Sequence, residues 1–157
     1  MLELAIPGRA LLRLGHLVLD VNGTLALDGD LLPGVADRLT ELRASLTLHL
    51  LTADTHGRQA DVDARLTLTG VRLTRGQPEA EQKATFVRAL GAAGVVAVGN
   101  GANDALMLRD AGLAIAVLGG EGLAAAALRE ADVVAADITT ALDLLLHPRR
   151  LVATLRR

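Results

Sequence analysis

The stretch LVLDVNGTLALDG, residues 17–29, places a short apolar run directly before an aspartate, Asp20, and an Asn-Gly turn. An apolar run of this length that ends in turn residues is typical of a strand buried in a parallel sheet. The Asp20 carboxylate would then stand at the carboxyl end of that strand, where open α/β sheets bind their ligands. There it can serve as a nucleophile, as a metal ligand or as a cap of the following turn.

Further apolar runs alternate with Ala-, Leu- and Arg-rich segments along the chain. This alternation predicts strands at residues 46–53, 66–74, 95–100, 113–118 and 133–136. It predicts helices at residues 33–44, 56–65, 78–90, 103–110 and 123–130, and in the tail from residue 138 onward. Strand followed by helix, repeated in this way, predicts an α/β fold of three layers, Rossmann-like, with a mainly parallel sheet.

The N-terminal segment does not follow this alternation. Two extended runs flank Pro7-Gly8 in LELAIPGRALLRL, residues 2–14, and this pattern predicts an antiparallel β-hairpin added at an edge of the sheet. A chain of 157 residues can bury one sizeable core. We therefore expect one domain over residues 1–157, with a hairpin extension at 1–15 and a core at 16–157.

Composition narrows the range of partners. The formal net charge is -2 and there is no basic block, so neither nucleic acid nor an anionic membrane surface is expected as a partner. Phe86 is the single aromatic residue, and the absence of cysteine removes disulfides, thiolate nucleophiles and cysteine-rich zinc sites. Without a secretory leader pattern or a long apolar span, the expected location is the cytoplasm.

Two other segments follow predicted strands at the same edge as Asp20. Thr52 ends the strand in LLTADTHG, residues 50–57, where its hydroxyl can bind a phosphoryl oxygen or cap a helix. In VVAVGNGANDALML, residues 95–108, Asp104 begins a helix and would point back toward Asp20. Two carboxylates and a backbone carbonyl that converge on one point suit Mg²⁺.

Two alternative motifs fit the same segments less well. Gly99 and Gly101 after a strand resemble a dinucleotide-binding turn, but the third glycine position is Asp104, whose charge would repel a pyrophosphate. A calcium-binding loop that starts at Asp20 would need glycine at Leu25 and glutamate at Leu31. The magnesium interpretation is therefore preferred.

Lys83 is the only lysine among the sixteen Lys and Arg residues of the chain. An ammonium group is a compact point charge and fits a space that a guanidinium does not. Its helix, EQKATFVRALG, lies between the Thr52 and Asp104 segments in the sequence.

Together these segments resemble a known family. DVNGTLA, LLTADTHG, the lone Lys83 and VGNGANDALMLRDAGLAIAV are similar, in order and spacing, to the four motifs of the haloacid dehalogenase (HAD) superfamily. The likeness is greatest to small soluble proteins related to the phosphorylation domain of P-type ATPases. It implies a HAD fold without a cap domain, because one helix and one strand already fill most of each interval between the motifs.

The resemblance also implies roles for individual residues. Asp20 would attack a phosphoryl group and become an aspartyl phosphate, Thr52 would bind the transferred group, and Lys83 would neutralise charge. The implied catalytic residues are Asp20, Asn22, Thr52 and Lys83. The implied substrate-binding residues are Gly23, Thr24, Ala53, Asp54 and Asn103. The implied Mg²⁺ ligands are Asp20, Asn22 through its backbone carbonyl, Asn100 and Asp104.

The sequence departs from the family pattern at two asparagines. Phosphatases of this superfamily carry a second aspartate two residues after the nucleophile, and this chain has Asn22, which cannot exchange a proton near neutral pH. P-type ATPases also lack that acid and accumulate a phosphoaspartate. Asn100 stands where many relatives have an acid beside the metal, which should weaken Mg²⁺ binding. The expected activity is therefore a slow phosphohydrolase or phosphotransferase.

A non-catalytic, phosphate-responsive module is the alternative function. In either case the expected partner is a small phosphorylated substrate or a phosphoprotein, and a second copy of the chain could cover the uncapped site. The histidines His16, His49, His56 and His147 show no metal-ligand spacing. His49 is expected in the core, and His56 with Asp54 could touch substrate.

Overall fold

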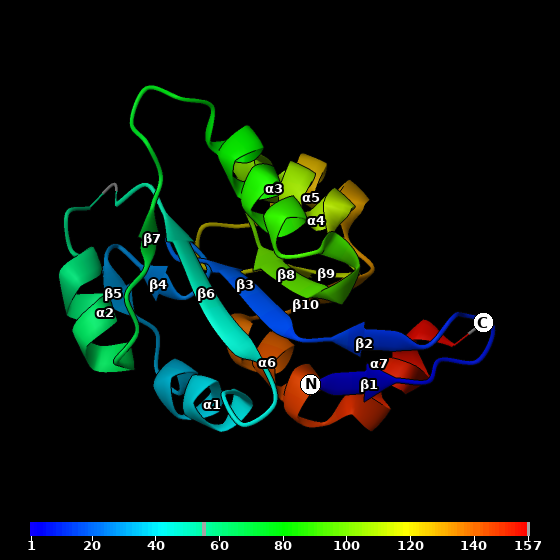
Figure 1. Ribbon diagram of the computed structural model, residues 1–157. Helices are drawn as coiled ribbons and strands as arrows, with labels where there is room; N and C mark the ends of the chain where they lie inside the picture. Colours follow the sequence, from blue (N-terminus) through cyan, green and yellow to red (C-terminus); the bar gives the residue numbers. More distant parts are fainter. Residues whose placement is uncertain (55, 157) are drawn as a thin grey trace.

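The computed structural model describes residues 1–54 and 56–156, and it forms a sheet with helices on both faces (Figure 1). All neighbouring strands of this six-stranded sheet are parallel, in the order β10-β9-β8-β3-β6-β7. The strands are β3 (His16–Asp20), β6 (Thr47–Thr52), β7 (Val71–Arg72), β8 (Val95–Gly99), β9 (Leu113–Val117) and β10 (Val133–Ala135). The predicted three-layer α/β fold is confirmed.

The helices divide between the two faces. One face carries α3 (Glu79–Ala89), α4 (Ala105–Asp110) and α5 (Ala125–Glu130), together with the short 3₁₀ helices η1 (Ala92–Gly94) and η2 (Ala102–Asp104). The other carries α1 (Val35–Leu42), α2 (Gln59–Leu66), α6 (Ile138–Leu146) and α7 (Pro148–Leu155). No inserted cap domain interrupts the sheet within the described ranges, 1–54 and 56–156.

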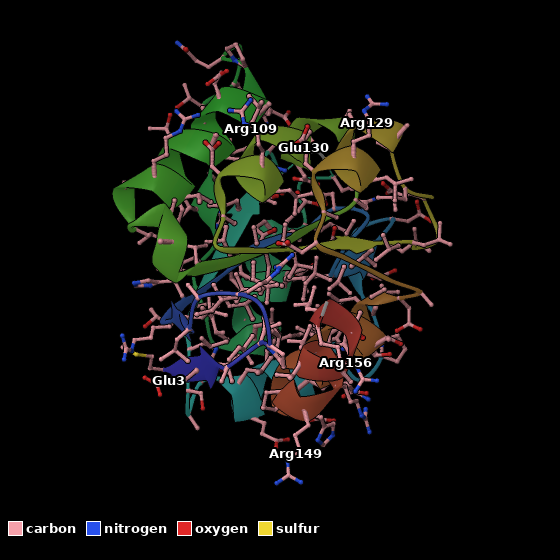
Figure 2. All side chains as sticks on the ribbon, turned by 90° about the vertical axis from the view of Figure 1, so that its right-hand side faces the viewer. Glu3, Arg109, Arg129, Glu130, Arg149 and Arg156 are labelled. Atoms are coloured by element: carbon pink, nitrogen blue, oxygen red, sulfur yellow. The ribbon has the colours of Figure 1, made fainter. Side chains whose placement is uncertain are left out.

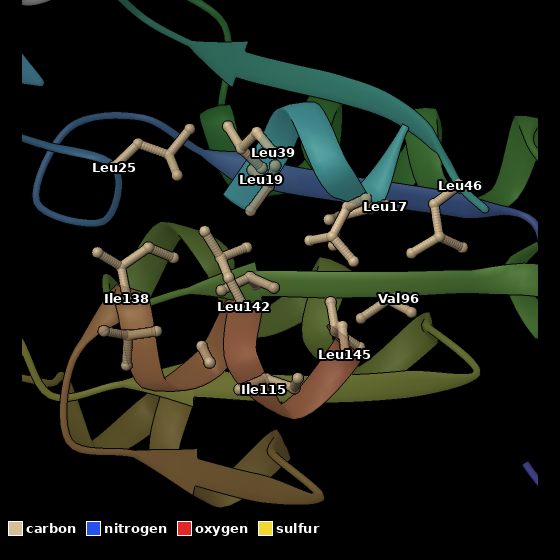
Figure 3. Close-up of a cluster of buried hydrophobic side chains, with 14 of the residues drawn as sticks. Leu17, Leu19, Leu25, Leu39, Leu46, Val96, Ile115, Ile138, Leu142 and Leu145 are labelled. Atoms are coloured by element: carbon tan, nitrogen blue, oxygen red, sulfur yellow. The ribbon is translucent and has the colours of Figure 1, made fainter. Parts of the chain in front are cut away.

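Two aliphatic cores follow from the alternation of side chains along the strands. In β3, Leu17 and Leu19 join the core under α1 and α6, whereas Val18 joins the core under α3 and α4. Figure 3 shows the larger core, in which Leu142 of α6 lies among side chains of the sheet. The residues that end each strand are thereby held rigidly at the sheet edge.

The strand predicted at residues 66–74 is wrong over most of that range. Of residues 66–74, only Val71 and Arg72 form a strand, since Leu66 ends α2 and Thr67 adopts a left-handed conformation with φ 50°. Asp63 then accepts hydrogen bonds from the Leu68 backbone N–H, through its carbonyl, and from that of Gly70, through its carboxylate. Local hydrogen bonds to a helix end have replaced strand pairing.

The N-terminal hairpin forms, but not as an edge of the main sheet. β1 (Leu2–Leu4) and β2 (Leu12–Leu14) pair antiparallel with one another and make a separate two-stranded sheet. β2 leads through Gly15 into β3, which already lies between β6 and β8. A strand that directly precedes a central strand therefore finds no free edge beside it.

A second hairpin follows the first strand of the core. β4 (Ala26–Leu27) and β5 (Asp30–Leu31) pair antiparallel across Asp28 and Gly29, which both have positive φ. Two such residues in succession are typical of a type I′ turn, for which Asp-Gly is a favoured sequence. Asp28-Gly29 could have predicted this hairpin from the sequence.

The C-terminal tail contains two helices, which meet at His147 and Pro148. Pro148 opens α7 because the first turn of a helix needs no donor from proline. Among residues 1–54 and 56–156, no helix has the length and apolar character needed to cross a bilayer.

His16 and His49 are neighbours on β3 and β6, far from the carboxyl ends of the strands. His16 Nδ1 and His49 Nε2 lie 3.1 Å apart, so one ring donates a hydrogen bond to the other, and the His49 ring also meets the edge of Phe86. Burial lowers the pKa of His49, and the neighbouring His16 lowers it further. Its predicted place in the core is confirmed only in part, since His49 is half-buried.

We predict that His49 makes the fold less stable in mild acid. Because its pKa is lower in the folded protein, the unfolded chain takes up a proton first as the pH falls through about 6.5, which favours unfolding. Urea unfolding at pH 7.5 and 5.5 should show a smaller loss of stability for His49→Gln than for the parent. An equal loss in both proteins would contradict this role of His49.

Candidate active site

Three strands deliver their last polar residues to one edge of the sheet. Asp20 ends β3 and Thr52 ends β6, whereas Asp104 lies in η2 just after β8. Lys83 reaches the same place from α3. All four side chains are buried, so the edge holds a compact polar cluster rather than a row of surface groups.

Lys83 joins the two acids directly. Its Nζ donates hydrogen bonds to Asp20 Oδ1 at 2.6 Å and to Asp104 Oδ1 at 2.7 Å, and the side chain is 1% exposed. Burial disfavours the charged lysine, but the two carboxylates outweigh it and raise the pKa of Lys83 above its usual value. The ammonium group therefore stays charged between Asp20 and Asp104.

For Asp20, unlike Lys83, the surroundings favour the neutral form of the side chain. The pKa of Asp20 is raised to about 7, because burial and the Asp104 carboxylate, which raise it, outweigh the Lys83 ammonium, which lowers it. Its Oδ2 atom lies 3.2 Å from the Thr24 hydroxyl, which also lies 3.1 Å from Asn100 Oδ1. Lys83 thus contacts one carboxylate oxygen of Asp20, and Thr24 connects the other to Asn100.

Backbone donors fix Asp104. Its Oδ2 accepts hydrogen bonds from the N–H groups of Asn100 at 3.0 Å and Gly101 at 2.9 Å. A Cβ on Gly99 would collide with the same carboxylate, so a residue without a side chain is needed there. Gly99 therefore serves close packing against an acid, which agrees with the rejection of a dinucleotide turn.

The two remaining residues with implied catalytic roles lie together at the site. Asn22 Nδ2 donates to Thr52 Oγ1 at 3.5 Å, and Thr52 Oγ1 also accepts the backbone N–H of Asp54 at 2.9 Å. Asn22 is half-buried, whereas Thr52 is fully buried. The amide of Asn22, rather than an acid, therefore lies beside the Thr52 hydroxyl at the end of β6.

The residues with implied substrate-binding roles are spread more widely. Ala53 lines an open hollow of about 360 Å³ together with Arg75, on the segment between β7 and α3. Asp54 Oδ1 accepts the N–H of Gln59, and Asn103 Nδ2 donates to Glu79 Oε2 at 2.6 Å, so both side chains hold neighbouring elements in place. Gly23 and Thr24 lie in the turn after Asp20.

His56 lies beside the β4–β5 hairpin. It packs on Gly29 and borders a small recess with Asn22 and Asp54. A role of His56 in contacting substrate therefore depends on a substrate that reaches past Asn22.

The donor set suits a hard divalent cation. Asp20, Asp104, the Asn100 amide and the Asn22 carbonyl offer only oxygen atoms, which Mg²⁺ prefers. The nearest oxygens of Asp20 and Asp104 contact the same nitrogen, so the two acids are close enough to act on one ion. Within the described chain, no group of three His, Cys, Asp or Glu side chains is placed to hold a metal ion. The predicted ligand set contains two acids, Asp20 and Asp104.

Sequence reasoning missed the loop between β9 and α5. Gly119 approaches the Gly23 carbonyl, Gly120 packs on Leu27 of the β4–β5 hairpin, and the Glu121 carboxylate occupies the space where a Cβ on Gly23 would lie. The run GGEG, residues 119–122, signals a tight turn in the sequence. Nothing in it indicates that the turn closes over the residues that follow Asp20.

Comparison with known proteins gives the family. The model of the haloacid dehalogenase-like hydrolase family matches residues 3–112. The uncharacterized protein MJ0073 of Methanocaldococcus jannaschii is 48% identical over 62 residues, which cover 40% of this chain and 67% of that protein.

Two solved structures are similar in fold. The 3-deoxy-D-manno-octulosonate 8-phosphate phosphatase of Moraxella catarrhalis, solved with magnesium ion, phosphate ion and KDO, has a TM-score of 0.61 at 17% identity. The match covers 91% of this chain and 94% of that one. A zinc-transporting PIB-type ATPase in its E2.Pi state has a TM-score of 0.61 at 29% identity, over 79% of this chain but 20% of the ATPase. The similarity to the ATPase is therefore confined to one part of that much longer protein.

We predict that removing the ammonium of Lys83 destabilises the protein and makes its stability depend on Mg²⁺. Lys83→Met leaves two buried carboxylates without their partner, a change that costs about 3–5 kcal/mol when a buried ion pair is broken. Urea unfolding measures the loss, and added Mg²⁺ should restore more stability to the variant than to the parent.

The matched control is Arg88→Met on the same helix. Arg88 pairs with Asp110 at 2.7 Å but is 48% exposed, so its loss should cost less than about 1 kcal/mol. Equal losses for the two variants would contradict a buried, electrostatically essential Lys83.

Proposed function

The chain belongs to the haloacid dehalogenase-like hydrolases, and we propose that it is a Mg²⁺-dependent phosphohydrolase or phosphotransferase that works through Asp20 with low turnover. The observation that carries this proposal is the Lys83 ammonium held between the Asp20 and Asp104 carboxylates at the carboxyl ends of the strands. Phosphoryl transfer requires mostly positioning and neutralisation of charge, and this cluster is built for both.

In the first step, a carboxylate oxygen of Asp20 attacks the phosphorus of the substrate. A bond forms between that oxygen and phosphorus, and the bond from phosphorus to the leaving oxygen breaks, which yields an aspartyl phosphate. Lys83 stays charged through the step and faces the nucleophile, so it offsets the negative charge of the phosphoryl oxygens. The buried Thr52 hydroxyl, beside Asn22, would donate to the transferred phosphoryl group.

Mg²⁺ would supply further charge neutralisation for the phosphoryl oxygens, and Asp20, Asp104, Asn100 and the Asn22 carbonyl are the groups that would hold it. The contribution of the protein is to prepare this position. Thr24 links Asp20 Oδ2 to Asn100 Oδ1, and two backbone N–H groups fix Asp104.

Asn22 makes both proton transfers inefficient. A carboxamide cannot protonate the leaving oxygen, so that proton must come from water. In the second step, water attacks phosphorus and the bond from Asp20 to phosphorus breaks, which frees the Asp20 carboxylate. Asn22 cannot accept the proton of the attacking water, so that proton passes to solvent water. General acid and base catalysis is typically worth about 10²–10⁴-fold, so the aspartyl phosphate should be long-lived.

The substrate is proposed to be a small phosphorylated compound or a phosphoprotein. The site is uncapped within the described residues, and the hollow beside Ala53 is open to solvent. Arg75 on its rim could meet a second anionic group of the substrate. A second copy of the chain could cover the same opening.

Asn22 and Asn100 also favour a second candidate, a non-catalytic module that responds to phosphate. In that function Asp20 is phosphorylated, or binds a phosphorylated ligand, and the state of the site is sensed by a partner. The two candidates differ in turnover.

We predict a stable covalent adduct at Asp20. Incubation with acetyl phosphate and Mg²⁺ should add the mass of one phosphoryl group to the parent, measured by intact mass spectrometry, and none to Asp20→Asn. Rapid release of inorganic phosphate without an adduct would contradict the slow second step. Phosphatase activity that survives Asp20→Asn would contradict Asp20 as the nucleophile.

We predict that Asn22→Asp accelerates turnover. An acid at this position restores proton transfer, so phosphate release from p-nitrophenyl phosphate should rise by about 10²-fold or more, and the adduct should decay faster. The double variant Asp20→Asn with Asn22→Asp is the control and should be inactive. An adduct as stable in Asn22→Asp as in the parent would contradict the assignment of Asn22.

A further inference from the structure

The loop between β9 and α5 is held against the candidate active site by several independent contacts. Asn100 Nδ2 donates to the Gly122 carbonyl at 3.1 Å, and the Asn100 carbonyl accepts the N–H of Ala124 at 2.9 Å. Gly122 N donates to the Gly119 carbonyl at 2.9 Å and closes the turn. Asn100 therefore holds the loop through hydrogen bonds to Gly122 and Ala124.

Glycines allow this loop to lie close to its neighbours. A Cβ on Gly119 would be 3.2 Å from the Gly23 carbonyl oxygen, and one on Gly120 would be 2.9 Å from Leu27. Larger residues would lift the turn away from the chain that follows Asp20. The turn thus has a fixed position, and Glu121 stands at its tip.

Glu121 and Asn100 border the same small space. That space lies where a Cβ on Gly23 would be, 3.0 Å from Asn100 Nδ2 and in contact with the Glu121 carboxylate. The other end of the Asn100 amide, Oδ1, meets the Thr24 hydroxyl that also reaches Asp20. Glu121 therefore lies on the far side of Asn100 from the nucleophile, at the mouth of the site.

The identity of residue 100 decides whether this arrangement can exist. The Asn100 amide donates to the Gly122 carbonyl, which an aspartate could not do, and an aspartate would repel the Glu121 carboxylate beside it. The same asparagine leaves the buried part of the site with two carboxylates and one ammonium, a net charge of one negative unit. A divalent cation is held weakly by so little charge.

We propose that Glu121 supplies the negative charge that Asn100 lacks and so strengthens binding of a divalent cation at the site. This inference rests on the proposed Mg²⁺ dependence. Mg²⁺ keeps several of its water molecules in proteins, so an exposed carboxylate at the mouth of the site can act on the ion through its water shell. Glu121 is then an electrostatic positioning residue, and Asn100 is the residue that holds its loop.

The test is the affinity for Mg²⁺ alone, measured by isothermal titration calorimetry at low ionic strength on the whole chain. Glu121→Gln should weaken binding about tenfold, since it removes one unit charge close to a divalent ion. Glu130→Gln, an exposed glutamate at the end of α5 (Figure 2), makes the same change of charge away from the site and should leave the affinity unchanged. High salt should shrink the difference between the parent and Glu121→Gln, because exposed charges are screened.

A double variant tests the exchange of roles between the two positions. Asn100→Asp combined with Glu121→Gln moves the carboxylate back to position 100 and should return the affinity to within about threefold of the parent. Binding by Glu121→Gln that equals binding by Glu130→Gln would overturn this inference and leave the proposed function intact. A parent chain that binds no Mg²⁺ would overturn both.

Discussion

The structure depends on one buried ammonium group that lies between two carboxylates. Asp20 ends β3 and Asp104 follows the neighbouring strand β8, and without Lys83 their charges would repel one another in a largely buried place. Lys83 in turn could not be buried without them. The contact therefore ties α3 to the ends of β3 and β8, and it holds the Asp20 carboxylate in a fixed, partly neutralised state.

The two asparagines share a physical logic. Asn22 and Asn100 both stand where acids are expected in this family, and each uses its amide nitrogen as a donor, to Thr52 Oγ1 and to the Gly122 carbonyl. A carboxylate could make neither bond at neutral pH. Each amide thereby holds a neighbouring segment, Asn22 the end of β6 and Asn100 the β9–α5 loop.

The two solved structures resemble this chain in different ways. The match to the Moraxella catarrhalis phosphatase extends over nearly the whole of both chains at low identity, which is a likeness of fold. The match to the zinc-transporting ATPase is higher in identity but covers 20% of that protein. The chain therefore combines the size of a small phosphatase-like domain with local sequence closer to the ATPase.

The sequence determined the α/β fold, most strands and helices, and the meeting of Asp20, Thr52, Lys83 and Asp104. Short apolar runs and the parallel-sheet rule predict the places of Asp20, Thr52 and Asp104, because the ends of parallel strands share one edge, whereas the place of Lys83 was implied by the resemblance to the HAD motifs. Pairings between distant segments were decided only in the tertiary structure. β2 found no free edge because β3 is central, and the predicted strand at 66–74 shrank because Asp63 captured its backbone donors. Glu121 reached the site because a glycine turn packs on Gly23, a contact that no local pattern encodes.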